Sequence, residues 1–141
     1  MNALLQLLGR LLIVALFLPA GLSKLTGFEG TVGYIASVGL PLPALGAVLA
    51  IVVEVAGSLS LLVGFQTRLV AAVLALFTLV ATVFFHAFWA VAPDQAFVQQ
   101  LMFFKNIAVV GGLLVLAATG GGAWSVDARK SADALAEQPT H

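Results

Sequence analysis

Four long apolar stretches run through the chain, and they constrain its fold more than any other feature. They cover about residues 4–25, 44–63, 69–90 and 96–119. A helix of about 20 mostly apolar residues is long enough to cross the hydrocarbon core of a bilayer. Because backbone polar groups find no partners in lipid, each stretch is predicted to be helical. The sequence therefore predicts an all-α integral membrane protein, an antiparallel up-down-up-down bundle of four transmembrane helices.

The composition supports this class. Hydrophobic residues make up 62% of the sequence and charged residues 9%, whereas soluble domains average roughly 45–50% apolar and about 25% charged residues. Residues 1–130 are expected to form a single transmembrane domain, and residues 131–141 a disordered polar tail. The charges of the six basic and six acidic residues cancel, and the basic residues are not clustered in one block. A nucleic-acid partner is therefore not expected.

The basic residues lie mainly at one end of the expected bundle. Arg10, Arg68, Arg129 and Lys130 fall on one side, against Lys24 on the other. The positive-inside rule therefore predicts that both termini lie in the cytoplasm. Arg10 and Arg68 are interpreted as structural or interface charges.

Ionisable side chains inside the apolar stretches form the candidate site. Glu54 is roughly 15 Å deep in the second stretch and Lys105 roughly 13 Å deep in the fourth, at about 1.5 Å per residue. A charge at this depth is costly, so a partner is expected, and we predict that Lys105 pairs with Glu54. His86 and Lys24 lie nearer the outer face, and Asn106 extends the polar strip. The pair is equally interpretable as a structural contact that sets helix register.

This polar set predicts a pocket in the outer half of the bundle. The inner halves of the last three stretches are almost purely apolar, and a conduction pathway would need polar groups along its full length. The chain has no cysteine, and His86 is its only histidine within the stretches. Iron–sulfur clusters, haem held by two histidines of one subunit, and metal centres are therefore not expected.

A series of short motifs resembles one family of membrane proteins. The motifs keep their order and spacing from about residue 10 to residue 129, across all four stretches. They are Arg10, residues 21–28, residues 39–41, Glu54 with Gly57, residues 64–68, His86, residues 102–106, residues 120–122 and residues 125–127. Together they are similar to the pattern of the DoxX family.

The resemblance implies a four-helix bacterial inner-membrane protein of the DoxX/DoxD type, a group linked to quinone-coupled redox work. Relatives are associated with thiosulfate:quinone oxidoreductase, with thiol and oxidative-stress complexes, and with metal or sulfur stress operons. The resemblance assigns no family-wide catalytic residue. The family-pattern positions that it carries over are Arg10, Lys24, Glu54, Arg68, His86, Lys105 and Asn106.

Three functions fit these residues. The first is a membrane subunit that binds a quinone, or a similar lipid, in the outer-half pocket and acts with a partner oxidoreductase. Glu54, His86 and Lys105 would supply hydrogen bonds and protons to the ring. Such a chain is at most an oxidoreductase subunit with no redox centre of its own.

The second function is a non-catalytic anchor or assembly partner of a redox or metal-stress complex, docked through residues 31–43. The third is proton-linked transport of a small solute with Glu54 as the protonated group. It ranks lowest, because the sequence lacks the paired broken helices of many transporters. The lipid bilayer is a partner in all three functions, and each is compatible with a homo-oligomer.

Overall fold

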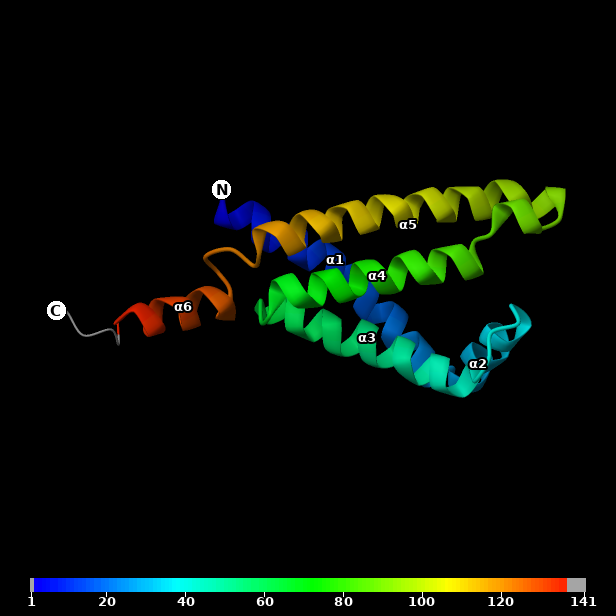
Figure 1. Ribbon diagram of the computed structural model, residues 1–141, viewed down its shortest axis with the longest axis horizontal. Coiled ribbons are helices and arrows are strands. Elements are labelled where there is room, and N and C mark those ends of the chain that lie inside the picture. Colours follow the sequence, from blue (N-terminus) through cyan, green and yellow to red (C-terminus); the bar gives the residue numbers. More distant parts are fainter. Residues whose placement is uncertain (1, 137–141) are drawn as a thin grey trace.

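The computed structural model describes residues 2–136 and confirms the all-α, four-helix fold (Figure 1). Four of its helices are long and apolar enough to cross a membrane, the third together with the 3-10 turn that follows it. The elements are α1 (Ala3–Thr26), α2 (Phe28–Ser37), α3 (Pro43–Val63), α4 (Thr67–Phe85), η1 (Phe88–Ala90), α5 (Pro93–Thr119) and α6 (Val126–Ala136).

The structure differs from the prediction of a disordered tail from residue 131, because α6 continues to Ala136. The hydroxyl oxygen of Ser125 accepts a hydrogen bond from the backbone N–H of Ala128 at 3.1 Å and so caps the first turn. Alanine, the strongest helix former, then recurs along α6. Residues 137–141 of the predicted tail lie outside the described residues.

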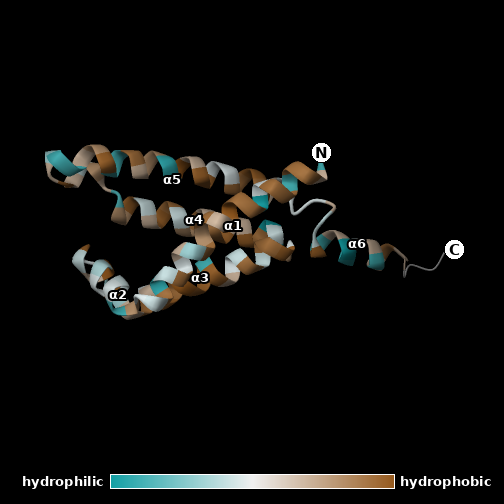
Figure 2. Ribbon diagram, turned by 180° about the vertical axis from the view of Figure 1, so that it is seen from behind, coloured by the Kyte–Doolittle hydropathy of each residue, from teal (hydrophilic) through white to brown (hydrophobic). Residues whose placement is uncertain are grey.

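The long helices pack as two pairs that separate at one end. α1 packs on α3, and α5 packs on α4. α3 and α4 meet at their short connection, residues 64–66, and diverge toward the end where α2 lies, as the views from the two sides show (Figures 1 and 2). Figure 2 also shows that the long helices are mostly apolar, whereas α6 is largely polar.

The hydrophobic core lies in the half of the bundle where α3 and α4 meet. Gly57 lets these two helices approach closely, because a Cβ atom there would lie 3.3 Å from the side chain of Leu74. All four long helices contribute to this core, whose buried members are Val14, Phe17, Leu61, Ala71, Leu74, Ala75, Leu113 and Leu116. The diverging half has no comparable core among the described residues, and it is there that the helices leave room for a cavity.

A buried arginine joins the helix ends beneath the core. Arg10 of α1 is only 1% exposed. Its Nη1 donates to the carbonyl of Leu61 at 3.3 Å and its Nη2 to the carbonyl of Trp124 at 2.6 Å. Gly64, at φ 72°, leaves the space that the guanidinium fills, since a Cβ atom would collide with it. Arg10 therefore lies at a junction of α1, the end of α3 and the segment before α6.

Asp127 makes a second contact at the same junction. Its two carboxylate oxygens accept hydrogen bonds from the backbone N–H groups of Gln66 at 2.7 Å and Thr67 at 2.8 Å, at the start of α4. Burial by itself raises the pKa of Asp127, but these N–H donors and the nearby Lys130 outweigh it, and the net pKa lies below its ordinary value. The carboxylate thus caps α4 from another helix.

Replacing Asp127 with alanine is expected to destabilise the protein by about 1–2 kcal/mol at neutral pH, the usual cost of losing a helix cap. Because the folded-state pKa is lowered, this contribution is present above the ordinary aspartate pKa of about 3.9 and is lost as the pH falls through the folded-state pKa. Asp127→Asn removes the charge and is expected to show a smaller acid-induced loss of stability than the unaltered protein. Thermal unfolding followed by circular dichroism measures both effects, and Asp133→Asn on the same helix is the control. If Asp127→Asn loses as much stability in acid as the unaltered protein does, Asp127 is not the cap of α4.

Candidate functional site

A cavity of about 510 Å³ lies between the diverging helix pairs, a size within the range of about 300–1,000 Å³ typical of small-molecule sites. Its walls come from α1, α2, α3, α4 and α5 and are largely apolar, with aromatic side chains that include Tyr34 and Phe84. Two of its lining residues, Leu49 and Val80, are 55% and 48% exposed. The cavity is therefore open to the surroundings of the bundle and is not enclosed by side chains.

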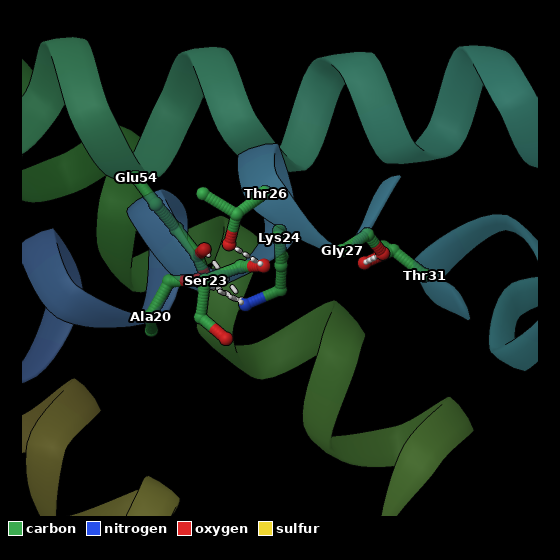
Figure 3. A network of polar contacts seen from close by, with 7 residues as sticks. All are labelled: Ala20, Ser23, Lys24, Thr26, Gly27, Thr31 and Glu54. Carbon is green, nitrogen blue, oxygen red and sulfur yellow. Dashed lines mark hydrogen bonds and ion pairs between the residues drawn. The ribbon is translucent and has the colours of Figure 1, made fainter. Parts of the chain in front are cut away.

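An ion pair forms the polar part of the α1–α3 wall (Figure 3). Lys24 Nζ lies 2.8 Å from Glu54 Oε2 and 3.0 Å from Glu54 Oε1, and it also donates to the carbonyl of Ala20 at 3.4 Å. Glu54 is 5% exposed. The prediction that Lys105 is the partner of Glu54 is therefore wrong, because Lys24 occupies both carboxylate oxygens.

The packing of α1 on α3 explains this pairing. A Cβ atom on Gly21 would lie 2.7 Å from Val55 Cγ2 and 3.0 Å from Glu54 Cβ, so glycine allows α1 to lie directly against α3. The side chain of Lys24 runs back along α1 to the level of the Ala20 carbonyl, the direction in which helical side chains project. Its ammonium group therefore lies deeper in the bundle than the position of Lys24 near the end of α1 suggests.

The opposite wall carries the remaining predicted site residues. Lys105 and Asn106 of α5 line the same cavity as Lys24 and Glu54. Among residues 2–136, no hydrogen bond or ion pair involves the side chain of Lys105. α5 packs on α4 rather than on α3, which places Lys105 across the cavity from Glu54.

His86 lines the cavity at the end of the bundle where α2 lies, and it ends α4. Its backbone, at φ −126° and ψ 37°, leaves the helical region, so the stretch predicted to run to residue 90 is broken here. The ring Nδ1 lies 2.8 Å from Gln99 Oε1 of α5. Because an amide oxygen only accepts hydrogen bonds, Nδ1 is the donor in this contact.

Tyr34 of α2 is a cavity residue that the sequence interpretation missed. Its hydroxyl donates to the carbonyl of Phe85 at 3.5 Å, and the two rings lie 5.1 Å apart. This contact links α2 to the end of α4 and closes the cavity at that end. The available signal was that Tyr34 is the only tyrosine of the chain and lies in the short segment between the first two spans.

The two arginines interpreted as structural charges lie at the other end of the bundle. Arg10 forms the junction described above, and Arg68 is exposed at the rim of a shallow hollow of about 430 Å³ beside residues 119–122. Neither lines the cavity. The sequence-predicted set therefore divides into five residues around one cavity, which are Lys24, Glu54, His86, Lys105 and Asn106, and two at the opposite end.

Comparison with known proteins places this architecture in a family. A family model described as DoxX matches residues 5–87. The chain is 39% identical to the inner membrane protein YphA of Escherichia coli (strain K12) over 125 residues, which is 89% of each chain. It is 42% identical over 124 residues to the inner membrane protein YqjF of the same strain, covering 86% of this chain and 88% of that one.

A more distant similarity reaches a eukaryotic protein. The chain is 30% identical over 127 residues to the Surfeit locus protein 4 homolog of Schizosaccharomyces pombe, and the match covers 89% of this chain but 37% of that protein. No solved structure matches.

The family model spans more than half of the chain, and both bacterial relatives match over most of its length. Their location agrees with the four helices that are long and apolar enough to cross a membrane. The protein is therefore a multi-pass inner-membrane protein, and it belongs to the DoxX family.

Proposed function

We propose that the cavity binds a quinone, or a similar lipid with a ring-shaped head and an apolar tail, and that the protein acts as a membrane subunit beside a partner oxidoreductase. One observation carries this proposal. A cavity of about 510 Å³ that opens to the bilayer has an apolar lining interrupted by a small set of ionisable side chains, Lys24, Glu54, His86 and Lys105. Few but well-placed polar groups in an apolar pocket are typical of small-molecule sites.

The lining suits the two parts of such a ligand. The ammonium of Lys105 and the amide of Asn106 donate hydrogen bonds, which the carbonyl oxygens of a quinone accept. Phe84 and Tyr34 offer aromatic faces for a flat ring. The exposed side of the cavity, beside Leu49 and Val80, leaves a path for the tail into lipid.

The other polar groups suit proton handling. A quinone serves as a carrier of electrons and protons, and the electrons would come from the partner oxidoreductase. His86, fixed by Gln99 through Nδ1, presents Nε2 as a proton acceptor. The Lys24–Glu54 pair supplies a second ionisable group on the opposite wall.

Lipid extraction from the purified protein tests the proposal. The unaltered protein in mild detergent is expected to retain a quinone, and Glu54→Gln, His86→Ala and Lys105→Met are expected to retain less while still folding. Lys130→Met is the matched control, because Lys130 lies on α6, away from the cavity. Absence of quinone from every preparation contradicts the proposal and favours the alternative role as a non-catalytic membrane anchor.

A further inference from the structure

The charged groups that line the cavity do not balance. Glu54 is the one carboxylate among its described lining residues, whereas Lys24 and Lys105 both contribute ammonium groups. Glu54 is already held by Lys24 through both of its oxygens, at 2.8 and 3.0 Å. The charges of Lys24 and Glu54 therefore cancel, and Lys105 is left as an uncompensated positive charge on the α5 wall.

Lys105 lies near the middle of α5, far from both ends of the helix. It lies about 18 Å from the first residue of α5 and about 21 Å from the last, at about 1.5 Å per residue. A charged side chain at such a depth is costly in hydrocarbon and is usually answered by a partner. No described carboxylate at the cavity is free to neutralise the charge of Lys105, so the counter-charge is expected to come from another molecule.

We infer that the ligand of the cavity is an amphiphile with a small anionic head, such as a carboxylate or an ionised ring hydroxyl, and that Lys105 binds this head. The inference rests on the proposed function, because both need a lipid in this cavity, and it adds the charge of that lipid. An ammonium–oxyanion contact is a charge-assisted hydrogen bond, roughly twice as strong as a neutral one. The adjacent Asn106 offers a second donor to the same head.

The size and depth of the cavity favour such an amphiphile over other sources of negative charge. A helix from another protein has a diameter of about 10–12 Å with its side chains, which does not fit within about 510 Å³. A phospholipid phosphate lies in the headgroup region, outside the hydrocarbon core that is about 30 Å thick. A lipid with a small anionic head and a single tail satisfies both limits.

Binding of two amphiphiles with identical tails tests the inference. Tritiated oleate is bound to the full-length protein in neutral detergent, at a pH at which the carboxylate is ionised, and is displaced with unlabelled oleate, oleyl alcohol or phosphatidylglycerol. Oleate is expected to bind about tenfold more tightly than the alcohol, a difference of about 1.4 kcal/mol. Lys105→Met is expected to abolish this preference, Lys105→Arg to retain it, and Lys130→Met to leave it unchanged.

Several results would overturn the inference. They are equal binding of oleate and oleyl alcohol by the unaltered protein, an undiminished oleate preference in a folded Lys105→Met variant, stronger displacement by phosphatidylglycerol than by oleate, or a crosslink from position 105 to another protein. The outcome is separable from that of the proposed function. If quinone copurifies but oleate binds no better than the alcohol, only the inference of an anionic head is refuted. If oleate binds better in a Lys105-dependent way but no quinone copurifies, only the identification of the ligand as a quinone is refuted.

Discussion

Replacing Lys24 with methionine is expected to destabilise the folded bundle by about 3 kcal/mol, the low end of the cost of removing one partner of a buried ion pair, because the Lys24 side chain is itself 31% exposed. Glu54, at 5% exposed, would remain in the wall of the cavity without its counter-charge. Unfolding in detergent mixtures of rising denaturant content, followed by circular dichroism, measures this loss. It lies at the upper end of the usual effect of a single substitution.

The double variant Lys24→Met/Glu54→Gln separates the structural contribution of the pair from its chemistry. Neutral replacement of both members of a buried pair is often close to neutral for stability. We therefore expect the double variant to recover most of the stability that the single variant loses. If Lys24→Met unfolds at the same denaturant content as the unaltered protein, Glu54 has another partner and the pair does not join α1 to α3.

Replacing Gly21 with alanine is the second substitution with a large expected effect. The added Cβ atom would lie 2.7 Å from Val55 Cγ2 and 3.2 Å from the Val55 backbone nitrogen. Such overpacking costs about 1–3 kcal/mol, and it would also separate Lys24 from Glu54. We expect lower stability by the same unfolding measurement, together with weaker ligand retention.

Gly111 of α5 is the matched control. It also lies inside a transmembrane helix, but no atom apart from the neighbouring backbone of α5 lies within 4 Å of a Cβ atom built there. Alanine has a higher helix propensity than glycine by about 1 kcal/mol, so Gly111→Ala is expected to be neutral or stabilising. A Gly21→Ala variant as stable as Gly111→Ala would contradict the close packing of α1 on α3.

The spans could be predicted from the sequence because the bilayer imposes their length. The second apolar stretch was expected at residues 44–63, and α3 covers Pro43–Val63. The third was expected to continue to residue 90, but His86 leaves the helix and bonds to Gln99. Hydropathy does not report such a break, because the apolar composition continues through η1. It also gave no indication that α6 would extend to Ala136.

The candidate site could be predicted only in part. The depth of four ionisable residues and of Asn106 along the spans placed these five residues in one region, and they do line one cavity. The pairing among them depends on which helices touch and on the direction of each side chain. Gly21 brings α1 onto α3, and Lys24 folds back toward Ala20. Neither property follows from depth, and so Lys105 was wrongly paired with Glu54.

The bundle combines a closed half with an open half. At one end, Arg10 and Asp127 join the helix termini and the apolar core is packed. At the other, α3 and α4 diverge around the cavity, and Tyr34 of α2 contacts the end of α4. If the cavity is a binding site, the closed end that holds the helices apart at the other end keeps this site formed before its ligand arrives.

The amount of quinone that copurifies with the unaltered protein tests the central claim most directly. If the cavity between the diverging helices is a quinone site, extraction and mass spectrometry are expected to find close to one quinone per chain, and a folded Lys105→Met variant is expected to retain far less. Quinone no more abundant than in control detergent extracts, or equal amounts in both proteins, would contradict it.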